Sequence, residues 1–161
     1  MRRDKEIEKA IARVERVIAK YPCVVVAFSG GADSSLLAYL ANRTGRTLAV
    51  VVDSPSMPRR DLDDATTFAR GHGISCMTLR SNEIENPEYI ANTGDRCYHC
   101  KREVYGRMIE LAHQLGYLAV LDGTNADDMK DDRPGIRAAR ELGVISPLCE
   151  AKITKKMVRS M

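Results

Sequence analysis

One stretch decides the fold of this chain: Val24-Val25-Val26-Ala27-Phe28-Ser29-Gly30-Gly31-Ala32-Asp33-Ser34-Ser35-Leu36-Leu37. A run rich in β-branched residues ends at Ser29, two glycines follow, and residues compatible with a helix resume at Ser34. This order predicts a buried strand, a tight turn and the N-terminus of a helix. Glycines let a ligand approach the backbone, and the first amides of a helix are unpaired and partly positive. The stretch therefore predicts an anion-binding loop, to which Ser29, Ser34 and Ser35 add hydroxyl donors.

The residue that sets this loop apart is Asp33. A Walker A loop would carry a lysine here and a dinucleotide-binding loop would read Gly-x-Gly-x-x-Gly, and this stretch has neither. A carboxylate beside a polyphosphate is tolerable only when a cation lies between them, so Asp33 is predicted to bind Mg²⁺. Written as Ser-Gly-Gly-x-Asp-Ser-Ser, the segment resembles the pyrophosphate loop of the PP-loop ATP pyrophosphatases. The alternative is a glycine turn that merely joins a strand to a helix.

Length and composition indicate one globular domain. The chain has 161 residues, 44% hydrophobic and 29% charged, which suits one full core and is too short for two ordinary domains. The domain is predicted to span residues 1–150, and residues 151–161 to form a basic tail, a frayed helix or the start of a second domain. A formal net charge of +3 does not point to a nucleic-acid partner.

The distribution of apolar residues gives an expectation for the compartment. No apolar run approaches the roughly 20 residues of a membrane span, and the first residues lack the apolar core of a signal peptide. We therefore expect a cytoplasmic protein with no membrane partner. Its five cysteines are then expected to be thiols, metal ligands or catalytic groups rather than disulfides.

Helical and strand-like segments alternate along the chain. Helices are expected at about 4–20, 34–43, 58–73 and 102–115, followed by a short helix that has Arg137 near its start and ends at about 142. Strands are expected at 23–28, 47–52, 74–79, 118–121 and 144–148. Residues 82–94 are expected to form a long loop over the ligand face. This alternation predicts an α/β fold with a doubly wound, mostly five-stranded parallel sheet and helices on both faces. The PP-loop resemblance implies the same architecture, that of the adenine nucleotide alpha hydrolase-like proteins.

A second polar loop follows the fourth predicted strand. It reads Asp122-Gly123-Thr124-Asn125-Ala126-Asp127-Asp128, and two further aspartates follow at 131 and 132. So many carboxylates close together would be costly without a metal or cationic partner. Because the carboxyl ends of parallel strands lie at one edge of a sheet, this loop is predicted to face the first. A solvated acidic loop is the alternative.

Two further residues are candidates for the same edge. Asp53 ends the second predicted strand, where it would bind the ribose or adenine side of a nucleotide or simply initiate a turn. Arg137 carries a planar guanidinium that could reach a phosphate or a substrate carboxylate. The two loops together suit ATP with Mg²⁺, the β- and γ-phosphates being held as the leaving group. The predicted reaction is adenylation with release of pyrophosphate.

Cys97 and Cys100 form a pair in Asp95-Arg96-Cys97-Tyr98-His99-Cys100-Lys101. Two cysteines three apart can bind one metal, but zinc or an iron-sulfur cluster needs further ligands, and Cys149 is the only other cysteine outside the predicted strands. The adjoining Arg96 and Lys101 could favour thiolates. A metal or redox site and a structural role both stay open.

Four motifs in the second half resemble one family within the superfamily. They are Arg96-Cys97-Tyr98-x-Cys100-Lys101, Asp122-Gly123-Thr124-Asn125-Ala126-Asp127-Asp128, Arg133-Pro134-Gly135-x-Arg137-Ala138 and Glu141-Leu142-Gly143-Val144-x-Ser146-Pro147-Leu148. In this order they look like the LarE family of ATP-dependent sacrificial sulfur transferases in nickel-pincer nucleotide synthesis. The resemblance covers nearly the whole chain.

The LarE resemblance implies a reaction and a set of site residues. AMP would be transferred to a carboxylate of a pyridinium dicarboxylate mononucleotide, and a protein-bound sulfur would then give a thiocarboxylate. Ser29, Gly30, Gly31, Asp33 and Ser34 would hold pyrophosphate and Mg²⁺. Thr124, Asn125, Asp127 and Arg137 would complete the nucleotide and substrate site, with Asp127 a second candidate ligand of Mg²⁺.

LarE proteins continue into a second domain that carries the sulfur-donating cysteine or the cysteines of an iron-sulfur cluster. This chain stops near Lys156-Met157-Val158-Arg159. A partner chain or homo-oligomer would supply that half, or Cys97, Cys100 or Cys149 would replace it, or the protein would only activate ATP or a different acid. The other hypotheses are an amide ligase of NAD or GMP synthetase type, a tRNA thiolase, and a nucleotide-binding subunit that needs a partner.

Overall fold

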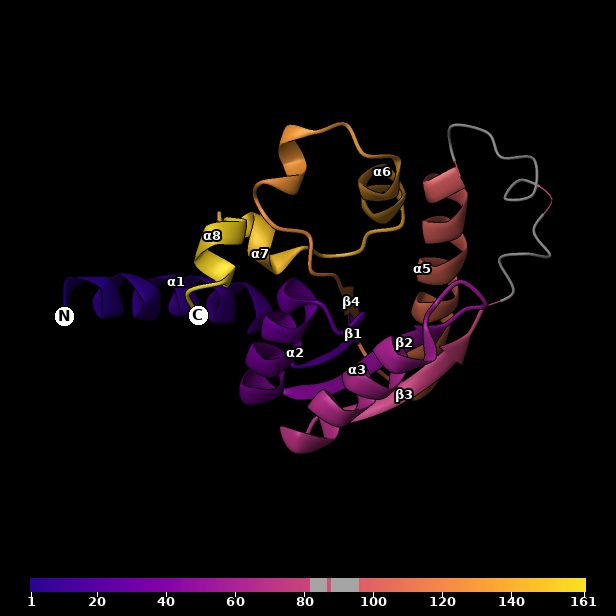
Figure 1. The fold of residues 1–161 in the computed structure, drawn as a ribbon, viewed down its shortest axis with the longest axis horizontal. Helices are drawn as coiled ribbons and strands as arrows, with labels where there is room; N and C mark the ends of the chain where they lie inside the picture. Colours follow the sequence, from indigo (N-terminus) through magenta and orange to yellow (C-terminus); the bar gives the residue numbers. More distant parts are fainter. Residues whose placement is uncertain (82–86, 88–95) are drawn as a thin grey trace.

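The structure, a computed structural model, describes residues 1–81, 87 and 96–161. Its centre is a parallel sheet of four strands in the order β3-β2-β1-β4 (Figure 1). The strands are β1 (Cys23–Ala27), β2 (Arg46–Asp53), β3 (Ser75–Arg80) and β4 (Ala119–Leu121). This confirms the predicted α/β class and parallel sheet. The long loop expected at 82–94 lies outside the described residues, except for position 87.

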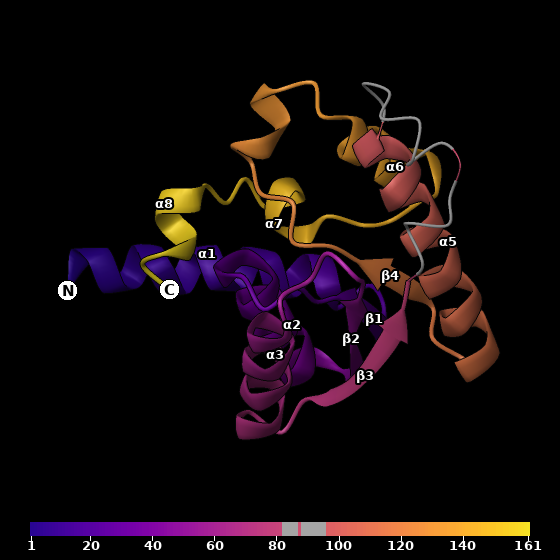
Figure 2. The same ribbon diagram turned by 45° about the vertical axis from the view of Figure 1, so that its right-hand side comes forward.

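Helices cover both faces of the sheet. They are α1 (Arg2–Ile18), α2 (Ala32–Thr44), α3 (Arg59–Gly71), α5 (Arg96–Leu115), α6 (Pro134–Glu141), α7 (Pro147–Glu150) and α8 (Lys155–Val158), with a 3-10 turn η2 (Asp128–Lys130). Figure 2 shows α2 and α3 on one side of the strands and α5 on the other. The described helices include none that is long and apolar enough to cross a membrane.

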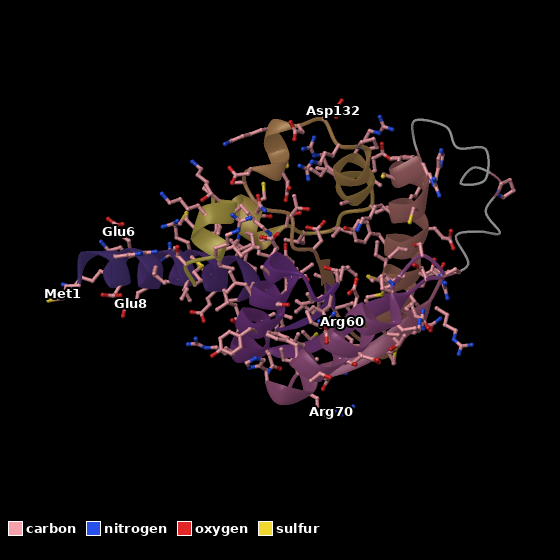
Figure 3. The ribbon with its side chains drawn as sticks, viewed as in Figure 1. Met1, Glu6, Glu8, Arg60, Arg70 and Asp132 are labelled. Atoms are coloured by element: carbon pink, nitrogen blue, oxygen red, sulfur yellow. The ribbon has the colours of Figure 1, made fainter. Side chains whose placement is uncertain are left out.

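The core divides into two clusters because successive strand residues point to opposite faces. Val24 and Val26 of β1 join α1, α2 and α3 in one cluster, whereas Val25 joins α5 and α6 in the other. Burial on both faces explains why β1 reads as a continuous apolar run. Charged side chains lie at the periphery, where Figure 3 shows several pointing away from the ribbon: Glu6, Glu8, Arg70 and Asp132.

The fifth strand expected at 144–148 is reduced to one bridge between Leu121 and Ile145. Pro147 explains the difference, since it lacks an amide hydrogen for a ladder and is favoured in the first turn of a helix, where it begins α7. The fourth helix also differs from the prediction, because α5 (Arg96–Leu115) includes the residues before Arg102. Cys97 and Cys100 therefore lie in this helix.

The C-terminal residues pack on the same core. In place of a frayed helix, the chain forms α7 and α8, which lie beside α1 in Figures 1 and 2. Ala151, Ile153 and Val158 are buried in the cluster that contains α1 and α2. Whether these residues also begin a second domain stays a prediction.

Candidate active site

A pocket of about 550 Å³ opens where the carboxyl ends of β1 and β4 meet. β2 and β3 lie on one side of β1 and β4 lies on the other, so this is the point at which the strand order reverses. Open parallel sheets bind ligands at such points. Both polar loops predicted from the sequence contribute to the lining, through Ser29, Gly31, Asp33 and Ser34 from the first and Asp122, Gly123, Thr124 and Asp128 from the second.

The first loop is held by its own hydroxyl groups. The Ser34 hydroxyl accepts the amide of Ser29 at 3.2 Å and donates to the carbonyl of Gly31 at 3.3 Å. Gly30 has a φ of +81°, and a Cβ there would lie 2.9 Å from the Cβ of Ala65, so a glycine is required. The N-cap of α2 is Gly31, which has no side chain to cap the helix. The amides of the first turn of α2 are therefore available to a ligand.

The second loop packs closely against the first turn of α2. A Cβ on Gly123 would lie 2.9 Å from the amide nitrogen of Ser34, so only glycine permits this approach. Asp122, which is 3% exposed, accepts hydrogen bonds from the Tyr105 hydroxyl at 3.0 Å and the Ser146 hydroxyl at 2.7 Å. Burial, and to a smaller extent Asp122, raise the pKa of Tyr105, which keeps it a neutral donor. These contacts hold the second loop in place.

Two carboxylates of the pocket contact a cation: Asp128 pairs with Arg133 at 2.8 Å, and Asp33 pairs with the Lys155 ammonium. Asp33 also accepts a hydrogen bond from the side-chain nitrogen Nδ2 of Asn125 at 3.4 Å. Asn125 is 3% exposed, and its side-chain oxygen accepts the amides of Asp127 at 2.9 Å and Asp128 at 3.2 Å. Asn125 thus shapes the second loop and joins it to Asp33.

The carboxylates of the pocket fit a magnesium ion carried by a nucleotide. Mg²⁺ is usually held by one or two carboxylates together with substrate phosphates. Asp33 and Asp128 both line the pocket, and the described part of the chain contains no group of three or more metal-ligating side chains that would form an all-protein cage. Lys155 shows that Asp33 accepts a cation at this position.

Three basic residues in the pocket were missed by the sequence analysis as site residues: Lys101, Arg133 and Lys155. Lys101 lies four positions before Tyr105 and seven before Met108, so the three residues share one face of α5. This spacing could have indicated that Lys101 faces the pocket. Thr154 before Lys155 was a sign of a helix start, and its hydroxyl accepts the amide of Met157 at 3.3 Å. No local pattern indicated that Lys155 would reach Asp33.

Asp127, a predicted ligand of Mg²⁺, is not among the residues that line the pocket, but it contacts Lys155, which is. Its carboxylate accepts the backbone amide of Lys155 at 2.8 Å and pairs with the Lys130 ammonium at 3.0 Å. These two contacts, the backbone hydrogen bond first, lower the pKa of Asp127 below its usual value. Asp127 therefore anchors the start of α8, and its magnesium role stays a prediction.

The anchor at Asp127 predicts a pH dependence of stability. Because its pKa is lower in the folded chain, the stability that it contributes is complete above the ordinary aspartate pKa of about 4 and is lost as the pH falls through the lowered value. We expect the free energy of unfolding of Asp127→Asn to fall less steeply below about pH 4 than that of the wild type. Urea unfolding of the wild type and the variant along a pH series measures this. Equal slopes of the free energy of unfolding against pH in the two proteins would contradict it.

Five other predicted residues are not among those that line the pocket: Gly30 and Asn125, described above, and Asp53, Arg137 and Ser35. Asp53 pairs with Arg59, whose hydrogen bond lowers the pKa of Asp53, and the neighbouring Val52 contributes to the lining instead. The guanidinium of Arg137 lies 4.5 Å from the ring centroid of Tyr98. Ser35 is half-buried, and its amide donates the first helical hydrogen bond of α2 to Gly31 at 2.9 Å. Nucleotide or substrate contacts by these residues stay predictions.

A second pocket of about 330 Å³ adjoins the first between α5 and α6. Cys97 lines it together with Pro134, Gly135 and Ile136, and Cys100 is half-buried in the same turn of α5. The pocket that Cys149 lines is a different one, beside α6 and α7. A zinc or iron-sulfur site at the pair stays a prediction, since the described residues include no group of three or more ligands.

Comparison with known proteins agrees with this geometry. The family model described as NAD synthase matches residues 6–97. An uncharacterized protein of Synechocystis is 39% identical over 96% of this chain and 59% of its own length. The pyridinium-3,5-bisthiocarboxylic acid mononucleotide synthase of Lactiplantibacillus plantarum is 36% identical over 86% of this chain and 51% of its own length. This chain thus spans about half the length of these relatives.

The fold also matches solved structures. The glutamine-dependent NAD⁺ synthetase of Acinetobacter baumannii, solved with adenosine diphosphate, superposes with a TM-score of 0.75 over 96% of this chain and 31% of that one, at 19% identity. At this identity the likeness shows the fold. The glycine loop, the strand order and the family match agree, and the chain therefore belongs to the NAD synthase family of PP-loop enzymes.

Proposed function

We propose that this chain uses ATP to adenylate a small carboxylate substrate, with release of pyrophosphate, and that the activated acid then receives sulfur. The observation that carries the proposal is the meeting of Asp33, Lys155 and the uncapped first turn of α2 in one pocket at the carboxyl end of β1. Partly positive amides and an ammonium suit phosphates, and a carboxylate beside them requires a bridging cation.

In this proposal the two loops bind different parts of ATP. The amides of the first turn of α2 and the hydroxyl of Ser29 would bind the β- and γ-phosphates and orient them as the leaving group. Magnesium held at Asp33 would neutralise charge that develops on the departing pyrophosphate. Lys155 would then exchange its contact with Asp33 for a phosphate oxygen and remain in the pocket. Thr124, whose backbone amide donates to Asp122, and Asn125, whose side chain donates to Asp33, would keep the second loop opposite the α-phosphate, where the acid would attack.

The acid would enter from the side of α5 and α6. Lys101 and Arg133 line both adjoining pockets. Arg133 pairs with the carboxylates of Asp128 at 2.8 Å and Asp131 at 3.3 Å, so Lys101 is the cation that would bind a carboxylate or a substrate phosphate on this side. A pyridinium dicarboxylate mononucleotide carries both groups, and the similarity to a synthase named for a bisthiocarboxylic acid mononucleotide favours this class and the sulfur step. This chain spans about half of that relative, and the proposal for the sulfur step therefore rests on the similarity of that half alone.

Release of pyrophosphate tests the proposal. Purified protein with ATP and Mg²⁺ should release pyrophosphate when a suitable acid is present, and the AMP should appear on the acid before sulfur is added. Release that depends on ammonia and yields an amide would instead favour the amide-ligase alternative. Tight ATP binding with no turnover on any acid would favour a nucleotide-binding subunit.

Lys155 provides a prediction specific to this pocket. Removing its ammonium in Lys155→Met should raise the KM for ATP by about 10- to 150-fold, since a hydrogen bond to a charged group contributes roughly 1.5 to 3 kcal/mol. Lys156→Met is the matched control, because Lys156 is exposed and lines a different groove, beside α1. Equal KM values for the two variants would contradict a phosphate-binding role for Lys155.

A further inference from the structure

The ion pair between Asp33 and Lys155 joins two segments that are far apart in the sequence. Asp33 lies in the first turn of α2, and Lys155 is the first residue of α8, 122 positions later. The Asp33 side chain is 22% exposed and the Lys155 side chain is 36% exposed. Because salt screens a partly buried pair less than a pair in open solvent, this contact persists at ordinary ionic strength.

Lys155 reaches Asp33 from a backbone that is held in place. Its amide donates to the carboxylate of Asp127 at 2.8 Å, and the hydroxyl of Thr154 caps the helix that begins at Lys155. Ile153, two positions earlier, is 0% exposed in the core. The ammonium can therefore move only through rotations of its own side chain. It competes for the carboxylate of Asp33 at the high effective concentration of a tethered group.

Both oxygens of the Asp33 carboxylate accept donors from this chain. Oδ2 accepts the Lys155 ammonium, and Oδ1 accepts Nδ2 of Asn125 at 3.4 Å. A metal ion at Asp33 must displace the ammonium, because two cations at one carboxylate repel one another. A free metal ion brings nothing that replaces the lost ion pair of Lys155. A triphosphate, in contrast, offers the ammonium new anionic oxygens within the same pocket.

We propose that Lys155 is a tethered counter-ion that bars free metal ions from Asp33 and gives way only when a nucleoside triphosphate brings a metal into the pocket. The ammonium then moves to a phosphate oxygen, and the carboxylate of Asp33 becomes free to bind the metal. Lys155 returns to Asp33 when pyrophosphate and its metal leave. The part played by the triphosphate rests on the proposed function, whereas the exclusion of free metal does not.

Binding of Mn²⁺ in the absence of any nucleotide tests the exclusion. Mn²⁺ replaces Mg²⁺ in this experiment because the electron paramagnetic resonance signal of the free ion measures how much is bound. We expect Lys155→Met to bind Mn²⁺ at least about tenfold more tightly than the wild type does, since the apparent affinity rises with the fraction of Asp33 that is free. This gain should vanish in the double variant that also carries Asp33→Asn.

Lys156→Met separates this competition from a general effect of charge. Lys156 is the next residue and is exposed, so the variant loses the same charge without touching the ion pair, and it should bind Mn²⁺ as the wild type does. The effect of Lys155→Met on Mn²⁺ is also opposite in sign to its expected effect on ATP. A mere loss of structure around Lys155 would weaken the binding of both ligands.

Three outcomes would overturn the inference. They are equal Mn²⁺ affinities of the wild type and Lys155→Met, a gain that persists in the double variant, and an equal gain in Lys156→Met. Circular dichroism of each variant establishes that it is folded. Because this measurement contains no ATP, a failed exclusion of Mn²⁺ and a failed release of pyrophosphate are separately visible.

Discussion

Replacing Asp33 with asparagine is expected to lower the rate of pyrophosphate release from ATP by about 100-fold or more. The amide has nearly the same shape as the carboxylate but lacks the charge that pairs with Lys155 and that would hold magnesium against the phosphates. The measurement is the initial rate of pyrophosphate release at saturating ATP and Mg²⁺, with the substrate acid present.

Asp132→Asn is the matched control for this change. Asp132 is exposed in the segment between η2 and α6, and it lies at the periphery in Figure 3. Its variant should keep the wild-type rate. A folded Asp33→Asn protein that also keeps the wild-type rate would show that the carboxylate takes no part in the reaction.

Truncating Ile153 to alanine is expected to lower the free energy of unfolding by about 2 to 5 kcal/mol. Its side chain is 0% exposed, in the core cluster that contains α1 and α2. Its carbonyl accepts the amide of Ala126 at 2.8 Å, which joins the C-terminal segment to the second loop. The lost packing should therefore also weaken the placement of Lys155.

Denaturant unfolding measures this effect, with Arg159→Ala as the control. Arg159 is exposed at the end of α8, and its truncation should change stability by less than about 0.5 kcal/mol. If Ile153→Ala unfolded at the wild-type denaturant concentration, residues 151–161 would not be part of this domain.

The sheet and the two loops were predictable because their signals are local. Burial on both faces makes the middle of β1 and residues 48–52 of β2 apolar, and the polar residues after β1 and β4 follow directly from the ends of those strands. Two glycines mark places where the backbone packs closely against another segment: Gly30 lies against Ala65, and Gly123 lies against Ser34. These features account for the correct fold class and for much of the pocket lining.

What the sequence did not reveal depends on contacts between distant parts of the chain. Lys155 meets Asp33 across 122 positions, and nothing near either residue indicates the pairing. Asp127 looked like a metal ligand because it lies in an acidic loop, but its carboxylate binds the start of α8. The early turns of α5 lack apolar periodicity, because Arg96 and Cys97 are exposed. Pro147 replaced an expected strand by a helix start.

A crystal structure with Mg²⁺ and an ATP analogue that cannot be cleaved between its α- and β-phosphates tests the central claim most directly. We expect the β- and γ-phosphates to accept hydrogen bonds from the first amides of α2, with Mg²⁺ between them and Asp33 and with Lys155 on a phosphate oxygen. A triphosphate bound away from the glycine loop, or a pocket that stays empty at saturating analogue, would contradict the account.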